Sequence, residues 1–226
     1  MAATRRIAVY GGTFDPVHNG HLEAARRILK LFALDEVLFM PAYVAPHKQR
    51  AIVSSAFHRY AMLVLATEDD DRLRISTAEL DARERVYTVE TVARLRERFG
   101  DTTRLFFIMG ADSWTEIRSW RDWERLLHLC DHIVVTRPGY DLDAAGVSAA
   151  AGTVIDLRGL GGEEVAALLS EQKGPRVFIS DAVMVEASAT DIRAAARAGA
   201  REKLAEVIPA RVVDYIEKYG LYRNVE

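Results

Sequence analysis

A chain of 226 residues is long enough for one large domain with a sizeable core. Half of its residues are hydrophobic and 28% are charged, which is the composition of a globular protein and argues against long disordered tracts or a membrane span. The net charge of −3 excludes a general basic surface for nucleic acid, so a phosphate ligand would have to be held locally. The single cysteine and the short apolar run at the N-terminus predict a cytoplasmic enzyme without an internal disulfide.

Short, continuously apolar runs predict strands that are buried on both faces, because a half-exposed strand would alternate polar and apolar residues. The runs are Ile7–Tyr10, Val37–Met40, Leu105–Met109, Ile133–Thr136 and Val177–Ser180, with a weaker sixth run at Arg74–Thr77. Helical patterns lie between them, at Leu22 to Phe32 and at Val89 to Phe99. This alternation predicts an α/β fold: a Rossmann-like, doubly wound parallel sheet with helices on both faces.

The whole chain, residues 1–226, is predicted to form a single domain. Leu142 to Ala151, rich in Ala, Gly and Ser, has the composition of a surface insertion rather than of a domain linker. C-terminal helices at about 189–219 would close the fold, and Pro209 predicts that the last segment is two short helices.

The stretch YGGTFDPVHNGH, Tyr10 to His21, occupies the first connection from strand to helix. In such a crossover, glycines allow positive φ and close approach of a ligand, and the N-terminus of the helix attracts anions. Pro16 stiffens the connection and Asp15 can hydrogen-bond its own backbone. The motif therefore predicts a phosphate site flanked by His18 and His21.

Two alternatives remain open for this stretch, and a metal site is also an alternative for a second group of residues. The stretch could be a turn alone, since Asp-Pro and Asn-Gly are turn dipeptides. Asp15, His18 and His21 could bind a metal ion, and so could His128, Cys130 and His132, although a helix entering a strand there would separate their side chains. The sequence holds neither the phosphate loop of nucleoside triphosphatases nor the dinucleotide fingerprint, because Thr13-Phe14-Asp15 follows the glycine pair.

A second phosphate site is predicted at Ser188–Arg193, where Ser188 or Thr190 can cap a helix. Arg193 in the first turn has the wrong charge for the helix dipole, a mismatch that an anion between them would resolve. The alternative is a surface arginine on a capped helix.

Lys48, with His47 beside it, lies in a polar segment that could close over phosphates or be merely solvated. Gly110 and Asp112 follow a strand end, where an acid can bind ribose or cap a helix.

The opening motif, with the His-x-Gly-His arrangement, resembles the signature of nucleotidyltransferases. Together with later motifs, it resembles the bacterial nicotinate-nucleotide adenylyltransferases over nearly the whole chain. The further motifs are Ala45–Lys48, Tyr87–Thr88, Gly110–Ser113, Ser119–Trp120, Arg137–Gly139, Ser188–Arg193 and Gly220–Arg223.

The resemblance implies transfer of AMP from ATP to nicotinate mononucleotide, by direct in-line attack without a covalent intermediate. His18 and His21 would be catalytic. Trp120, unlike the core residue expected at Trp123, would stack on the pyridine ring, while Thr88 and Arg137 would bind the nicotinate carboxylate. The ATP-binding set would be Gly11, Gly12, Thr13, Phe14, Lys48, Gly110, Asp112, Ser188, Thr190 and Arg193.

The resemblance further implies Mg²⁺ carried by the ATP phosphates without a protein ligand, small-molecule substrates, and neither a nucleic-acid nor a membrane partner; a homo-oligomer stays open. Three other functions are weighed against it. A pantetheine-phosphate type of adenylyltransferase shares the opening motif, a nucleotide sensor would bind without turnover, and a relative of aminoacyl-tRNA synthetases would need room for tRNA binding.

Overall fold

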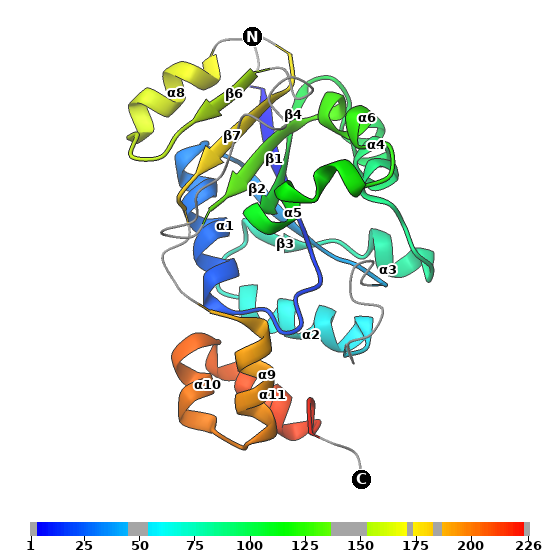
Figure 1. Ribbon diagram of the computed structural model, residues 1–226, viewed down its shortest axis with the longest axis vertical. Helices are drawn as coiled ribbons and strands as arrows, with labels where there is room; N and C mark the ends of the chain where they lie inside the picture. Colours follow the sequence, from blue (N-terminus) through cyan, green and yellow to red (C-terminus); the bar gives the residue numbers. More distant parts are fainter. Residues whose placement is uncertain (1–3, 45–53, 137–152, 171–173, 183–186, 224–226) are drawn as a thin grey trace.

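A computed structural model describes residues 4–44, 54–136, 153–170, 174–182 and 187–223 (Figure 1). Its centre is a seven-stranded sheet in the order β3-β2-β1-β4-β5-β7-β6, and every pair of neighbours is parallel. The strands are β1 Arg5–Gly12, β2 Glu36–Pro41, β3 Leu73–Ile75, β4 Thr103–Gly110, β5 Asp131–Val135, β6 Thr153–Asp156 and β7 Arg176–Ser180. The parallel α/β fold expected from the sequence is confirmed.

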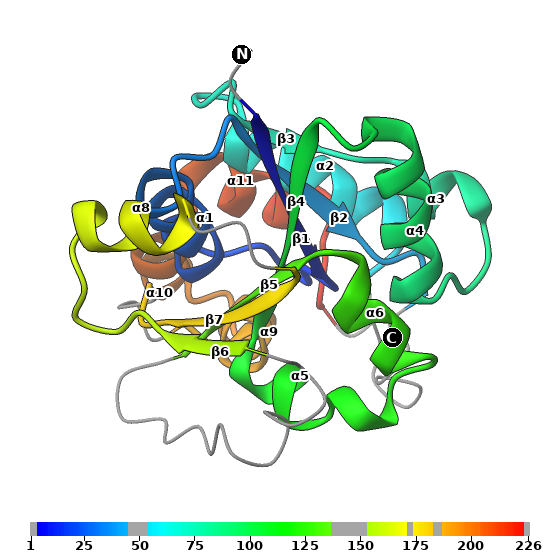
Figure 2. The same ribbon diagram turned by 90° about the horizontal axis from the view of Figure 1, so that it is seen from above.

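Helices cover both faces of the sheet, as Figure 2 shows with α1 and α8 on one side and α4 and α6 on the other. The first face is covered by α1 Asn19–Leu31, α2 Ala56–Thr67 and α8 Gly162–Ser170. The second face is covered by α4 Thr88–Phe99, α5 Ala111–Thr115, the short 3-10 helix η1 Ile117–Ser119 and α6 Trp123–Leu129. The short helix α3 Ala78–Ala82 follows the edge strand β3.

The continuous apolar runs are explained by two cores, one on each face of the sheet. Because successive strand residues point to opposite faces, Tyr10 of β1 packs in the first core while Val9 packs in the second. In β4, Phe106 and Phe107 divide in the same way. Strands buried on both sides have no polar face to alternate with, which is why their sequences read as unbroken apolar runs.

Three C-terminal helices, α9 Ala189–Arg197, α10 Arg201–Val207 and α11 Ala210–Lys218, group at one end of the molecule beside α2 (Figure 1). Pro209 is the residue before α11, so the predicted interruption is confirmed. Ile192, Leu204 and Val213 bury their side chains in the first core. This shared core supports the single-domain assignment, which stays a prediction.

Some elements differ from the sequence-based expectation. β3 ends at Ile75 and β5 at Val135, before the predicted ends, while β6, α2 and α8 were not predicted. The Ala-rich segment 142–151 lies outside the described residues. Within the described parts of the chain, no helix is both long and apolar enough to cross a membrane.

Candidate active site

The predicted site lies where the strand order of the sheet reverses, between β1 and β4. Successive strands run outward from β1 through β2 to β3, and the chain then returns to place β4 on the other side of β1. Ligands of open α/β sheets bind at the carboxyl ends of strands at such a point. Gly12 ends β1 and Gly110 ends β4, so both predicted phosphate-side segments reach this edge. Residues 13–18, between β1 and α1, are called the phosphate loop below.

The two glycines before the phosphate loop are required by close packing of aromatic rings. A Cβ on Gly11 would lie 2.9 Å from the Phe107 ring, and one on Gly12 would lie 2.8 Å from the Phe14 ring. Neither glycine has a positive φ, so the conformational role expected for them is wrong. The positive φ falls instead on Phe14, at 50°, a value that is uncommon for a bulky side chain.

The two histidines lie together at the start of α1. Their rings stack with centroids 3.6 Å apart, and the N–H of His18 donates to Nδ1 of His21 at 3.3 Å. An Nδ1 that accepts places the proton of a neutral His21 on Nε2, which makes Nε2 a hydrogen-bond donor. Phe14 packs edge-on against His21 at 5.1 Å and fixes the ring further. α1 begins at Asn19, ahead of Leu22, the first residue of the predicted helical pattern.

Asp15 is an anchor of the phosphate loop, with partners that were not foreseen. Its side chain is buried, with 3% exposure. Oδ1 accepts from the hydroxyl of Tyr222 at 2.7 Å, and Oδ2 accepts from the N–H of Ser54 at 3.2 Å. The carboxylate thus ties the loop to segments far along the chain, in place of the bond to its own backbone that the turn chemistry favoured.

Arg59 of α2 clamps three segments at the same edge, and sequence reasoning missed it. The guanidinium donates to the carbonyl oxygens of Thr13 at 2.7 Å, Ala42 at 2.6 Å, Tyr43 at 3.2 Å and Ser54 at 3.1 Å. Its exposure is 1%. Burial lowers the pKa of Arg59, and the charge of Asp15 acts in the opposite direction. The available signal was an arginine inside the mostly apolar stretch AFHRYAMLVLAT.

The structure brings the second predicted phosphate segment to the same loop. Arg193 of α9 donates through Nη1 to the carbonyl oxygen of Asp15 at 2.7 Å and through Nη2 to the hydroxyl of Thr190 at 3.2 Å. Arg193 lies in the second turn of α9, not the first. Ser188 occupies the N-cap position, but its side chain makes no capping hydrogen bond within the described residues. The bond from Arg193 to Asp15 brings the two predicted phosphate segments together.

Gly110 and Asp112 lie at the carboxyl end of β4. Gly110 is the N-cap of α5, so the alternative in which Asp112 caps that helix is wrong. Asp112 lies in the first turn of α5 with an exposed side chain. An exposed carboxylate beside the switch point is free of protein packing constraints and can face a ribose.

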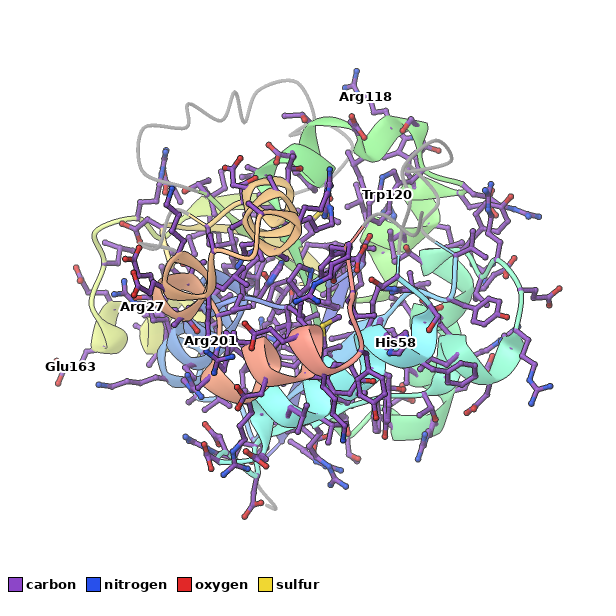
Figure 3. All side chains as sticks on the ribbon, turned by 90° about the horizontal axis from the view of Figure 1, so that it is seen from below. Arg27, His58, Arg118, Trp120, Glu163 and Arg201 are labelled. Atoms are coloured by element: carbon purple, nitrogen blue, oxygen red, sulfur yellow. The ribbon has the colours of Figure 1, made fainter. Side chains whose placement is uncertain are left out.

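On the second face of the sheet, Trp120 follows η1 and Thr88 begins α4. Figure 3 labels Trp120 among the side chains. Trp120 is partly buried, and its ring packs edge-on against Phe107 at 6.4 Å. Phe107 also lies against Gly11, so the Phe107 ring separates Trp120 from β1. Trp123, expected in the core, is only partly buried, with the Arg118 guanidinium 6.0 Å from its ring.

Comparisons with known proteins agree with this arrangement. Residues 9–195 match the family model described as cytidylyltransferase-like. A probable nicotinate-nucleotide adenylyltransferase of Thermoanaerobacter sp. is 34% identical over 226 residues, covering 100% of this chain and 98% of the relative. A relative of the same description in Symbiobacterium thermophilum is 38% identical over 221 residues, covering 98% of this chain and 97% of the relative. This chain belongs to the nicotinate-nucleotide adenylyltransferase family.

A solved structure supports the fold of this adenylyltransferase. The nicotinic acid mononucleotide adenylyltransferase of Plasmodium falciparum, complexed with NaAD, superposes with a TM-score of 0.71 at 18% identity, covering 98% of this chain and 100% of the other. At that identity the likeness shows the shared fold. Sequence similarity to the bacterial relatives is what places the chain in the family.

Two residues of the predicted site lie outside the described parts of this adenylyltransferase. Lys48, with the rest of Ala45–Lys48, falls in the segment 45–53. Arg137, with Pro138 and Gly139, falls in the segment 137–152. Their roles stay predictions.

The described residues contain no group of three or more His, Cys, Asp or Glu side chains that could hold a metal ion. At the first alternative site, Asp15 and His21 have protein partners for the atoms named above. At the second, the exposed ring of His128 contacts the carbonyl oxygen of Glu124 at 2.7 Å. Burial lowers the pKa of His132 to about 4 and raises the pKa of the Cys130 thiol, which disfavours a thiolate ligand.

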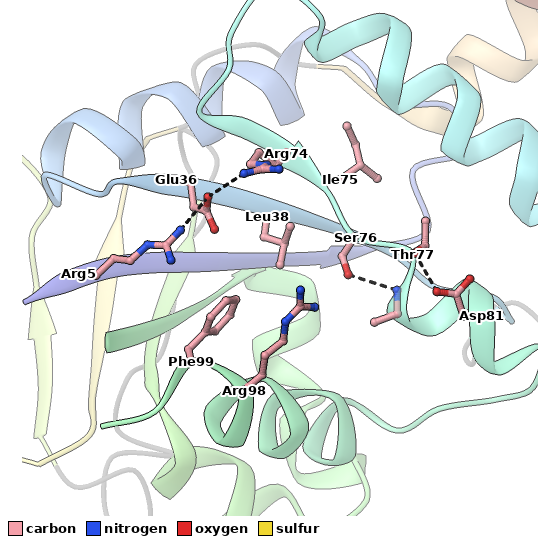
Figure 4. Close-up of a pocket in the computed structure, with 11 residues that line it drawn as sticks. Arg5, Glu36, Leu38, Arg74, Ile75, Ser76, Thr77, Asp81, Arg98 and Phe99 are labelled. Atoms are coloured by element: carbon pink, nitrogen blue, oxygen red, sulfur yellow. Dashed lines mark hydrogen bonds and ion pairs between the residues drawn. The ribbon is translucent and has the colours of Figure 1, made fainter. Parts of the chain in front are cut away.

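A cavity of about 460 Å³ lies between α4 and α3, on the sheet face that α4 covers (Figure 4). Arg5 and Arg74 approach a carboxylate oxygen of Glu36 at 3.3 and 3.9 Å, and Thr77 donates to Asp81 at 2.8 Å. Arg5 and Glu36 begin β1 and β2, so this cavity reaches the amino ends of the strands. It is separate from the edge that carries the histidines.

Proposed function

We propose that nicotinate mononucleotide attacks the α-phosphate of ATP in line at the carboxyl ends of β1 and β4, without a covalent enzyme intermediate. The reaction of the family is transfer of AMP from ATP to nicotinate mononucleotide, giving nicotinate adenine dinucleotide and pyrophosphate. The phosphate of the mononucleotide is already a nucleophile, so positioning and charge stabilisation suffice for catalysis. One observation carries the proposal: two stacked histidines at a helix start, on a loop that Arg193 also contacts.

His18 and His21 would stabilise charge on the α-phosphate as the new bond forms. The neutral His21 ring presents Nε2 as a donor, because Nδ1 accepts from the backbone of His18. Gly11, Gly12, Thr13 and Phe14 line the approach to the N-terminus of α1, whose N–H groups and dipole favour an anion. Donors that are already fixed need no reorganisation when the charge develops.

Arg193, Thr190, Ser188 and Lys48 would bind the triphosphate, since a guanidinium fork suits phosphate oxygens. Gly110 and Asp112 would bind the ribose and adenosine side of ATP. A metal ion enters with ATP in this family, and we assign it as Mg²⁺, which would supply positive charge to the leaving pyrophosphate.

Nicotinate mononucleotide would bind on the second face, with Trp120 stacked on the pyridine ring and Thr88 at the helix start receiving the carboxylate. Arg137 would be a second contact for that carboxylate. The proposal includes no nucleic-acid partner and no membrane partner, and it leaves the number of subunits to experiment.

The test is pyrophosphate release from ATP with three acceptors measured side by side: nicotinate mononucleotide, nicotinamide mononucleotide and phosphopantetheine. We expect the largest kcat/KM with nicotinate mononucleotide. Turnover with phosphopantetheine and not with the pyridine nucleotides would assign the pantetheine-phosphate reaction instead. Nucleotide binding without release of pyrophosphate from ATP in the presence of any of the three acceptors would leave only a sensor.

A further inference from the structure

We propose that Tyr222, on the segment after α11, is a positioning residue that holds the phosphate loop in its reactive shape by fixing Asp15. The proposal rests on the proposed function, because it assigns a role within the same site. Tyr222 would touch neither substrate, and its effect would pass through the carboxylate of Asp15 to the histidines.

The carboxylate of Asp15 depends on two donors from distant segments. The Tyr222 hydroxyl, 207 residues away in the sequence, bonds Oδ1 at 2.7 Å, and the N–H of Ser54 bonds Oδ2 at 3.2 Å. With 3% exposure, Asp15 has little access to bulk water that could replace either donor. A buried carboxylate that loses a donor must find another partner or move.

Movement of Asp15 would disturb the rest of the phosphate loop. Its backbone carbonyl accepts from Arg193 at 2.7 Å, so the same residue is held at its main chain and at its side chain. The loop is fixed before Asp15 by the bond from Arg59 to the carbonyl of Thr13, and after it by the bond from the His18 N–H to His21. Asp15 is the anchor between these two points.

The segment after α11 is shaped to deliver Tyr222 to this anchor. The N–H of Leu221 donates to the carbonyl of Ile216 at 3.0 Å, and Gly220 adopts a φ of +60°, which ends the helix and turns the chain back. Tyr222 itself has a φ of +67°, an uncommon conformation for an aromatic residue that its surroundings must maintain. Burial and the nearby Asp15 raise the pKa of Tyr222, so its hydroxyl remains a donor.

The test compares Tyr222→Phe with a matched control, Tyr219→Phe. Tyr219 lies three residues earlier, is 52% exposed, and packs its ring against Tyr215 at 4.6 Å. Amide hydrogen exchange of residues 13–18 is measured without substrate, together with kcat and KM for ATP and nicotinate mononucleotide. For Tyr222→Phe we expect exchange in the phosphate loop to rise about tenfold and kcat to fall about tenfold, with both KM values within about threefold of the parent.

A purely structural role at the end of α11 would give a different result. Exchange would then rise in α11 alone and kcat would stay within about twofold of the parent, which would overturn the proposal. A second check uses Asp15→Asn: in that background, Tyr222→Phe should lower kcat little further, whereas an equal, additive loss would mean that Tyr222 does not act through Asp15.

Two contingencies remain informative. If Tyr222→Phe does not fold, Asp15→Asn carries the test, and the proposal requires the same rise in loop exchange and about a tenfold loss of kcat. If the parent protein shows no adenylyl transfer, the proposed function fails, while hydrogen exchange in the phosphate loop still decides whether Tyr222 fixes it.

Discussion

The proposed phosphate side of the site and its proposed pyridine side are held in different ways. On the phosphate side, residues 13–18 are anchored by buried charged groups, Asp15 at 3% exposure and Arg59 at 1%, which bond to several distant segments. On the proposed pyridine side, the segments bearing Thr88 and Trp120 are held by packing in the second core, which includes aromatic contacts. Phe107 packs edge-on against Trp120, and the Arg121 guanidinium lies 4.6 Å from the Tyr87 ring.

The difference follows from what each side has to do. Groups that stabilise a developing charge must be fixed before the reaction, because reorganising them during it raises the barrier. A network of hydrogen bonds specifies direction as well as distance, which suits the phosphate side. A stacking surface for a flat ring tolerates small displacements, so aromatic packing is sufficient on the pyridine side.

The largest effect is expected from removing the clamp on the phosphate side. Arg59→Met leaves four carbonyl oxygens without their donor and removes one of the positive charges near Asp15. Breaking a buried charge network in this way costs about 3 to 5 kcal/mol, which urea unfolding would measure. Arg94→Met, at an exposed position of α4, is the control and should change stability by less than about 0.5 kcal/mol. If Arg59→Met were as stable as Arg94→Met, the claim that buried charged groups anchor residues 13–18 would be rejected.

The next effect is on turnover. His18→Ala or His21→Ala should lower kcat by about 100-fold or more with the fold intact, the scale of losing one transition-state donor. His128→Ala, at an exposed ring on α6, is the control and should keep parental kcat. Steady-state pyrophosphate release measures both. A histidine variant of the phosphate side with parental turnover would contradict the catalytic assignment.

A partly buried carboxyl beside the first turn of α4 sharpens the contrast. Glu79 of α3 accepts one hydrogen bond, from Thr91 of α4 at 2.8 Å, and burial raises its pKa from 4.5 to about 7. The folded state then binds a proton that the unfolded chain releases, so the free energy of unfolding should fall as pH rises from 4.5 to about 7. Within the described parts of the chain, Thr91 is the one side-chain donor to Glu79, whereas Asp15 has two donors and lies near the charge of Arg59.

Glu79→Gln keeps an acceptor for Thr91 and removes the charge. At about pH 8 it should be more stable than the parent by up to about 3 kcal/mol, and the advantage should vanish near about pH 4. Urea unfolding across this range measures the difference. Glu84→Gln, at an exposed position, is the control and should follow the parent curve. Parallel curves for Glu79→Gln and the parent would show that Glu79 has an ordinary pKa.

The smallest effect is expected at the stacking surface. Trp120→Ala should raise KM for nicotinate mononucleotide about tenfold and leave KM for ATP nearly unchanged, as expected for one lost aromatic contact. Trp123→Phe, three residues away, is the control for changes in local packing. Equal effects of Trp120→Ala on both KM values would reject the assignment of Trp120 to the pyridine ring.

The sequence predicted elements and motifs well where the signal was local. Strands buried on both faces showed as unbroken apolar runs, and the start of α4 at Thr88 and the break at Pro209 were marked by single residues. The histidine pair was recognisable because a turn alone has no use for imidazoles beside a helix start. Helix α2 was missed, since apolar residues surround most of it and leave a weak amphipathic pattern.

The anchors of the site could not be predicted, because they join residues far apart in the sequence. The sequence around Asp15 does not indicate that Tyr222 is its partner. Arg59 bonds main-chain carbonyl oxygens, which every residue has, so the sequence cannot mark which residues accept these bonds. Gly11 and Gly12 were expected to allow a positive φ, whereas the Phe107 and Phe14 rings that leave no room for a Cβ there depend on tertiary packing.

The Arg59 clamp also bears on how this protein can change over evolutionary time. All four of its bonds go to main-chain oxygens, so the side chains at Ala42, Tyr43 and Ser54 play no part in them. Substitution at those positions can therefore alter the rim of the site while the backbone beneath it stays in place. Because Arg59 bonds the main chain, the side chains of the bonded residues can vary among related proteins while the backbone that positions the site is kept.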